Sequence, residues 1–117
     1  MIKKIFNSVR NAIAGLVHAY KFDKSFRMEI WGSAMFVVVA ALLWPLSGIE
    51  FILLTLSYLL ILITELINTA VEQMLERLHP ERHEIIGKSK DIASAAVLTA
   101  FVFAVVVVAV MIQSRFF

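Results

Sequence analysis

The sequence contains no cysteine, so disulfide bonds and thiolate metal sites are excluded. Its four glycines stand alone, and none belongs to a glycine-rich phosphate loop. A nucleotide-binding protein of this sequence would therefore work without a Walker motif or a protein-kinase glycine loop. The formal net charge is only +2, with basic residues scattered among acidic ones, which argues against nucleic-acid binding. The N-terminus shows no apolar core followed by a cleavage site, so we expect no signal peptide.

What the chain has in excess is apolar residues. They make up 61% of its 117 residues, against about 45–50% in an ordinary soluble domain. The excess lies in three blocks with almost no charge. A soluble domain of this size exposes too much of its surface to hide so many apolar side chains. The composition therefore predicts an all-α membrane protein that forms a single membrane domain.

Residues 1–29 are expected to form an amphipathic helix on the membrane surface. Lys3, Lys4, Arg10 and Asn11 fall largely outside its apolar face. A soluble helix packed on a core would show the same pattern, but the chain offers no soluble core. The apolar face consists of Ile2, Ile5, Phe6, Val9, Ile13, Leu16, Val17 and Tyr20.

Three transmembrane helices are predicted, over 30–46, 49–72 and 92–112. The second is expected to continue into the cytoplasm to about residue 78, because nothing before His79-Pro80 breaks a helix. Residues 79–91 then form a polar connection. The third span contains no charged residue, and in lipid its valine run forms a helix because only a helix satisfies its own backbone.

The basic residues predict the orientation. They gather in the N-terminal segment and between the second and third spans, whereas the short turn at Pro45 has none. The positive-inside rule places the N-terminus and the long connection in the cytoplasm, so both lie at one membrane face.

A stripe of polar residues begins where the second apolar block ends. Glu65, Asn68, Thr69 and Glu72 are spaced i, i+3, i+4 and i+7, so they share one helix face. Polar residues at membrane depth are costly and mark functional sites or a bundle interior. Carboxylates one or two turns apart can divide the work of a general base and a Mg²⁺ ligand. A solvated extension is the alternative, but it suits Glu65 poorly because apolar residues flank it.

A second polar cluster follows, and by itself it favours a solvated cytoplasmic turn over a phosphate-binding site. Lysine or histidine near a phosphate could nevertheless neutralise the charge of a transferring phosphoryl group. The cluster consists of His83, Glu84, Lys88, Lys90, Asp91 and Ser94.

At these positions the sequence resembles the bacterial diacylglycerol kinases. The stretch ELINTAVE at 65–72 matches the family signature of Glu, Asn, a small hydroxyl residue, Ala and Glu. A second block matches with HE at 83–84, KD at 90–91 and SAAVL at 94–98, and a third with FRME at 26–29. Three blocks in order are more specific than one, and the resemblance covers nearly the whole chain.

The resemblance implies a kinase that uses ATP and Mg²⁺ to convert diacylglycerol to phosphatidic acid at the cytoplasmic face of the bacterial inner membrane. It also implies a homotrimer whose active sites are shared between subunits. Glu65 corresponds to the general base, and Glu72 and Asp23 to the metal ligands. The residues that the resemblance assigns to ATP are Lys4, Asn11, Asp23, Glu72, Glu81, Arg82, His83, Lys90 and Asp91. Those assigned to the lipid substrate are Glu65, Asn68, Arg27, Glu29 and Ser94.

Three residues depart from the usual family pattern. Asp23 is one methylene shorter than the usual Glu, and Lys4 replaces an Arg and so loses bidentate phosphate geometry. Asn11 stands where an aromatic residue is often found. Two alternative functions are left open: an undecaprenol kinase, which shares the helix signature, and a non-catalytic membrane protein such as a transporter subunit or assembly factor. The latter predicts polar residues along a path across the bilayer, which the charge-free third span does not offer.

Overall fold

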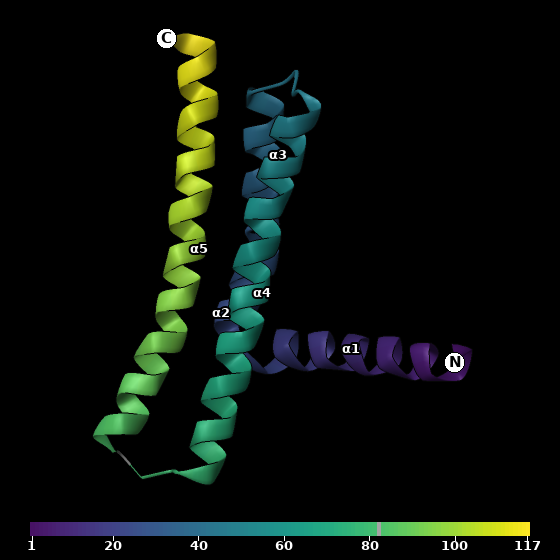
Figure 1. Cartoon of the computed structure of the whole chain (residues 1–117), viewed down its shortest axis with the longest axis vertical. Coiled ribbons are helices and arrows are strands. Elements are labelled where there is room, and N and C mark those ends of the chain that lie inside the picture. Colours follow the sequence, from purple (N-terminus) through teal and green to yellow (C-terminus); the bar gives the residue numbers. More distant parts are fainter. Residues whose placement is uncertain (82) are drawn as a thin grey trace.

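The computed structural model describes residues 1–81 and 83–117. Within these residues the chain is helical, with no strand, which confirms the predicted fold class. The helices are α1 (Ile2–Phe22), α2 (Lys24–Trp31), α3 (Ser33–Leu42), α4 (Gly48–Leu78) and α5 (Glu84–Phe116) (Figure 1). Three helical stretches in this part of the chain are long and apolar enough to cross a membrane: Lys24–Leu42, Gly48–Leu78 and Glu84–Phe116.

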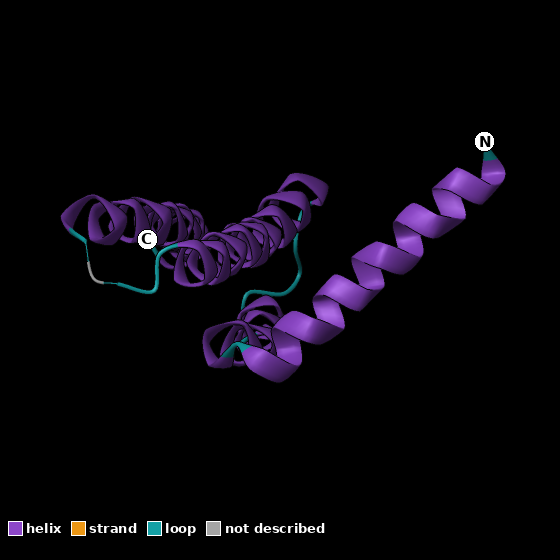
Figure 2. Ribbon diagram, turned by 90° about the horizontal axis from the view of Figure 1, so that it is seen from below, coloured by secondary structure: helices purple, strands orange, loops and turns teal. Residues whose placement is uncertain are grey.

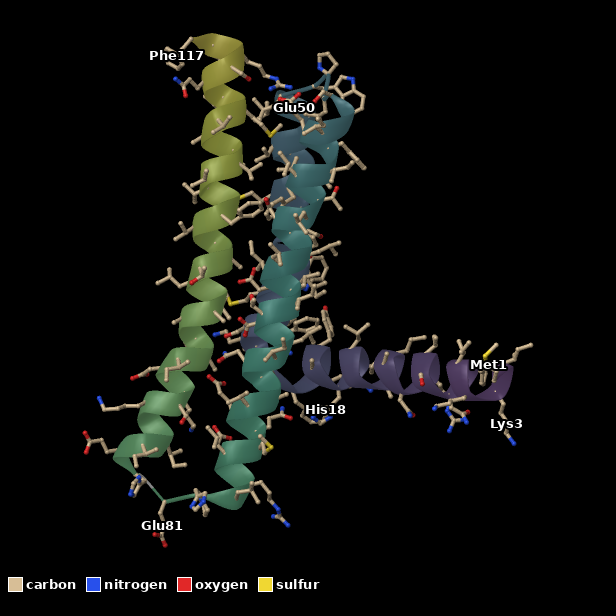
Figure 3. The ribbon with its side chains drawn as sticks, viewed as in Figure 1. Met1, Lys3, His18, Glu50, Glu81 and Phe117 are labelled. Atoms are coloured by element: carbon tan, nitrogen blue, oxygen red, sulfur yellow. The ribbon has the colours of Figure 1, made fainter. Side chains whose placement is uncertain are left out.

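Helix α1 projects sideways from the bundle formed by the other helices (Figures 1 and 2). Most of its apolar residues are exposed, and Ile5, Val9 and Ile13 are each more than half exposed. Lys3 and His18 point toward the end of the molecule where Glu81 lies, whereas Met1 points to the other side (Figure 3). One face of α1 is thus apolar and the other polar, as in a helix that lies on a lipid surface.

The helix bounds differ from the expected ones at Asp23. The segment 1–29 was expected to be one surface helix, but α1 ends at Phe22, and Asp23 takes an extended conformation with φ −116° and ψ 110°. The Asp23 carboxylate accepts a hydrogen bond from the backbone N–H of Ser25 at 3.0 Å, so it caps the N-terminus of α2. Helix α2 is therefore separate from α1, and together with α3 it forms the first apolar stretch, Lys24–Leu42.

The second difference concerns the connection between the last two helices. Residues 79–91 were expected to be a polar connection, but α5 already begins at Glu84. The His83 imidazole caps this helix, because its Nδ1 accepts a hydrogen bond from the Ile85 N–H at 3.1 Å. An acidic first-turn residue, Glu84, suits the positive end of the helix dipole. The polar residues after Glu84 therefore lie on a helix that faces α4.

Small residues allow α4 and α5 to pack closely along their length. Ile61 of α4 is 1% exposed and packs with Ala100 and Ala104 of α5. Ser57 is fully buried one turn earlier, and its hydroxyl donates to the Leu53 carbonyl at 2.8 Å. Close approach of backbones at small residues is typical of helices packed within membranes. This packing fixes the two helices that carry most of the predicted site.

Helix α2 is fastened to α4 by the Tyr58 hydroxyl, which donates to the Glu29 carbonyl at 3.0 Å. Phe26 of α2 is buried, with 1% of its surface exposed. The Tyr58 ring also packs on Phe36, with the ring centroids 4.9 Å apart. These contacts hold the junction of α2 and α3 against α4, so the side chains of α2 are carried to the face of α4 that bears the polar stripe.

At the opposite end of the bundle, Arg115 joins the end of α5 to the turn before α4 (Figure 3). Its Nη1 and Nη2 donate to the two carboxylate oxygens of Glu50 at 2.5 and 2.8 Å. Its Nε donates to the Leu43 carbonyl at 2.8 Å, and Nη2 donates to the Pro45 carbonyl at 3.0 Å. A bidentate guanidinium pair of this kind is a strong and geometrically specific contact. We call the pair formed by Glu50 and Arg115 the clamp.

Breaking the clamp is expected to lower thermal stability. Both Arg115→Met and Glu50→Gln should reduce the melting temperature in detergent by several degrees, and the double variant should lose little more because each change removes the same pair. Glu76→Gln is the matched control. The Glu76 carboxylate lies 3.6 Å from the Lys90 ammonium, and an exposed ion pair of this kind contributes little to stability. A clamp variant that melts with the wild type would show that the pair contributes nothing to stability.

Candidate active site

The polar stripe of α4 is buried against the neighbouring helices. Glu65, Asn68 and Thr69 are only 5%, 8% and 6% exposed, although each is polar or charged. The Asn68 amide lies 3.4 Å from the Glu72 carboxylate, to which it donates. The Asn68 Oδ1 atom is buried and finds no hydrogen-bond partner among the residues that the structure describes. A buried acceptor without a partner is uncommon in proteins and indicates that a group from outside the chain completes this site.

The stripe meets a carboxylate from the junction of α1 and α2. The Thr69 hydroxyl lies in hydrogen-bond contact with Asp23 Oδ2 and is also 2.9 Å from the Glu65 carbonyl. The other Asp23 oxygen caps α2 through Ser25. Asp23 and Thr69 are 46 positions apart in the sequence, so this contact exists only because α2 packs against α4.

A cavity opens where α4 faces α5 and the start of α2. Its volume is about 350 Å³, and it is lined by Ser25, Glu65, Asn68, Glu72, Ser94, Val97 and Leu98. Carboxylate, amide and hydroxyl groups converge on one side of it, beside apolar side chains of α5. We call it the stripe cavity. It brings together Glu65, Asn68 and Ser94, which were assigned to the lipid substrate, with Glu72, which was assigned to the metal.

The acidic groups at this site repel one another. Asp23, Glu29 and Glu72 all lie near enough to Glu65 to act on its charge. A cation would relieve this repulsion, and carboxylate and amide oxygens are the ligands that Mg²⁺ prefers. Among the described residues, no three His, Asp or Glu side chains are placed to hold a metal ion together. The oxygen donors of this site are of the type that Mg²⁺ takes, and this ion commonly completes its coordination with phosphate and water.

A second cavity, of about 450 Å³, lies toward the loop between α4 and α5. It is lined by Glu76, His79, Pro80, Glu81, His83, Ile86, Gly87, Lys90 and Asp91. We call it the loop cavity. It contains four of the residues assigned to ATP, and the Lys90 ammonium is 3.6 Å from the Glu76 carboxylate. Glu72 and Glu76 are one turn apart on α4, about 6 Å along the axis, so the two cavities adjoin along the same helix pair.

Other predicted residues are not brought to either cavity within this chain. The Arg27 guanidinium donates to the carbonyls of Tyr20 at 2.9 Å and Lys21 at 3.3 Å, so it holds the end of α1. Lys4 and Asn11 lie on the N-terminal half of α1, which carries them away from α4 (Figure 1). Arg82 lies outside the described residues.

Sequence reasoning missed Ser25, and it placed Thr69 in the polar stripe without a specific role. Ser25 lines the stripe cavity and bonds Asp23 through its backbone, and Thr69 contacts Asp23 directly. For Ser25 the available signal was the sequence Asp23-Lys24-Ser25, because an aspartate at this position can cap a new helix. For Thr69 the helical spacing of the stripe gave its face, but no local signal gave its partner, because the contact with Asp23 joins two distant segments.

Comparison with known proteins relates most of the chain to one family. Residues 10–112 match the family model described as prokaryotic diacylglycerol kinase. The chain is 36% identical to a diacylglycerol kinase of Haemophilus influenzae over 96 residues, which are 82% of this chain and 80% of that protein. It is also 36% identical over 103 residues to the Escherichia coli K12 protein of that name (87% and 83% coverage) and 34% identical over 99 residues to the Pseudomonas aeruginosa one (85% and 80%). The chain therefore belongs to the prokaryotic diacylglycerol kinase family.

Proposed function

We propose that this protein transfers the γ-phosphoryl group of ATP to the hydroxyl of diacylglycerol and so produces phosphatidic acid. The observation that carries this proposal is the stripe cavity, in which buried acidic and amide groups of α4 adjoin the polar loop cavity. A lipid hydroxyl and a nucleotide could thus meet at one point on α4. The membrane-spanning helices and the family relationship support the same activity.

On the acceptor side, Glu65 takes the proton of the lipid hydroxyl as its oxygen attacks the γ-phosphorus. The new oxygen–phosphorus bond forms while the bond to the β-phosphate oxygen breaks, and ADP leaves. Glu65 is suited to this task because it is buried and lines the stripe cavity. Asn68 and Ser94 line the same cavity and orient the lipid headgroup, and Glu29 lies close to Glu65.

On the donor side, the loop cavity holds the nucleotide. Lys90 supplies positive charge for the phosphates, and His79 and His83 add hydrogen-bonding groups. Glu81 and Asp91 accept hydrogen bonds from the sugar or the base. Transfer of a phosphoryl group depends chiefly on positioning and charge neutralisation, so a cavity without a glycine-rich loop can support it.

Glu72 and Asp23 would hold Mg²⁺, with the Asn68 side chain nearby on the same face of α4. When bound, it neutralises the negative charge of the transferring phosphates. Glu72 lies on the side of the stripe cavity nearest to the loop cavity, and Asp23 is kept beside α4 by Thr69. Glu72 thus stands between the acceptor and donor sides, with Asp23 beside the same helix.

The protein is proposed to lie in the bacterial cytoplasmic membrane, with α1 and the loop cavity at the cytoplasmic face. The basic N-terminal segment and the polar side chains of α1 support this orientation (Figure 3). We also propose a homotrimer. Lys4 and Asn11 are carried away from their own α4, which supports an arrangement in which they serve a neighbouring subunit.

The substrate is tested by offering diacylglycerol and undecaprenol together in mixed micelles with labelled ATP and Mg²⁺. We expect label in phosphatidic acid and a kcat/KM for diacylglycerol at least about tenfold above that for undecaprenol, because the ester oxygens of diacylglycerol can bond polar side chains of the stripe cavity and a polyprenyl alcohol has no such oxygens. The reverse preference would identify an undecaprenol kinase. If neither lipid is labelled, the protein is not a kinase for these lipids, and a non-catalytic role is favoured.

A further inference from the structure

The hydroxyl of Thr69 is the point at which α4 meets the junction of α1 and α2. It contacts the Asp23 carboxylate, and no other side chain of α4 bonds that carboxylate in the part of the chain that the structure describes. The residue is 6% exposed, so water competes little for this contact. Thr69 follows Glu65 by one helical turn and precedes Glu72 by three residues, and all three lie on one face of α4.

We propose that Thr69 is a positioning residue whose hydroxyl holds the Asp23 carboxylate beside Glu65 and Glu72. This inference rests on the proposed function, because it gives the hydroxyl a role in building the Mg²⁺–nucleotide site. Thr69 itself touches neither the lipid nor the nucleotide in this account. It acts through Asp23.

The charges at the site explain why such a contact is needed. Asp23 and Glu65 repel each other, which favours rotation of the Asp23 side chain away from the stripe. Packing of α2 on α4 brings the Asp23 backbone to this place, and the Thr69 hydroxyl then holds the carboxylate toward α4. A hydrogen bond to an ionised oxygen is stronger than one between neutral groups, which favours Asp23 over the Glu65 carbonyl as the acceptor of the single hydroxyl proton.

The side-chain length makes the contact more important here. Asp23 is one methylene shorter than Glu, so its carboxylate has a smaller reach across the gap between α2 and α4. One of its oxygens already accepts the Ser25 N–H at 3.0 Å. The other is left for Thr69. Both oxygens are thus oriented, and their remaining lone pairs are fixed in space for a cation.

The test compares Thr69→Val with Thr69→Ser in the full-length protein. Valine keeps the branched shape and removes the hydroxyl, whereas serine keeps the hydroxyl. Mn²⁺ is the probe, and its binding in the presence of a non-hydrolysable ATP analogue is measured by the EPR signal of free Mn²⁺. We expect Thr69→Val to raise the half-saturating Mn²⁺ concentration about tenfold, or about 1.4 kcal/mol, and Thr69→Ser to stay within about threefold of the wild type.

Two further variants separate a positioning role from a merely structural one. Thr64→Val is the matched control, because the Thr64 hydroxyl donates only to the Leu60 and Ile61 carbonyls of its own helix, at 2.8 and 3.1 Å. It should bind Mn²⁺ like the wild type. In an Asp23→Ala background, Thr69→Val should cause no further weakening, because the hydroxyl acts only through that carboxylate.

The outcomes also separate this inference from the proposed function. Wild-type binding by Thr69→Val, or weakening that is additive to that of Asp23→Ala, would overturn the positioning role even if lipid phosphorylation is observed. Weakening confined to Thr69→Val and absent when Asp23 is removed would support it, whichever lipid accepts the phosphate. A wild-type protein that binds no Mn²⁺ with the nucleotide analogue would overturn both.

Discussion

Glu65→Gln is expected to lower kcat for phosphate transfer to diacylglycerol by about a hundredfold or more. General bases contribute roughly 10²–10⁴-fold to rate, and glutamine cannot take the proton of the lipid hydroxyl. The side chain is 5% exposed, so the neutral amide of similar shape should fit the site without a cavity. Initial rates with labelled ATP in mixed micelles, at saturating Mg²⁺ and lipid, measure the effect.

The control for this variant is Glu50→Gln, which removes a carboxylate from the far end of the same helix. It should transfer phosphate at the wild-type rate when assayed well below its melting temperature, because the clamp lies away from both cavities (Figure 3). Binding of the nucleotide analogue should also survive in Glu65→Gln, since Glu65 lines the acceptor side. A Glu65→Gln protein with wild-type kcat would remove Glu65 as the base.

Glu72→Gln is expected to have the second largest effect, through the metal. An amide is a weaker Mg²⁺ ligand than a carboxylate, and a metal ion stabilises the transferring charge by several kcal/mol, so kcat/KM should fall on the order of a hundredfold. The half-saturating Mg²⁺ concentration should rise at the same time. A titration of rate against Mg²⁺ at fixed ATP measures both quantities.

The pattern of loss distinguishes Glu72 from Glu65. Excess Mg²⁺ should restore part of the rate of Glu72→Gln and none of the rate of Glu65→Gln, because only the first change weakens metal binding. Glu50→Gln again serves as the control, with an unchanged Mg²⁺ dependence. An unchanged Mg²⁺ dependence in Glu72→Gln would show that the ion is held elsewhere.

The helical stripe was predictable from the sequence because it is local. Four polar residues at spacings of three and four must share a helix face, and the structure places three of them in the stripe cavity, with Thr69 beside Asp23. The apolar blocks likewise predicted helices that can cross a membrane. Both inferences need only the period of a helix and the polarity of each residue.

The corner at Asp23 was missed because helical spacing of apolar residues continues on both sides of it. The break depends on one capping carboxylate and on the burial of Phe26, and neither changes the hydrophobic pattern. The loop cavity was ambiguous for a related reason, since composition by itself does not distinguish a solvated turn from a binding site. Its form follows from the early start of α5 at Glu84, which sets Lys90 and Asp91 opposite Glu76.

The central claim is that the acidic face of α4 is the phosphoryl-transfer site of a lipid kinase. The most direct test follows labelled phosphate from ATP into diacylglycerol with the purified wild-type protein, before and after Mg²⁺ is removed by chelation and then restored. The account predicts phosphatidic acid that forms only when ATP, lipid and Mg²⁺ are all present and that reappears when Mg²⁺ returns. Absence of labelled phosphatidic acid when ATP, lipid and Mg²⁺ are all present, with the protein folded, would contradict it.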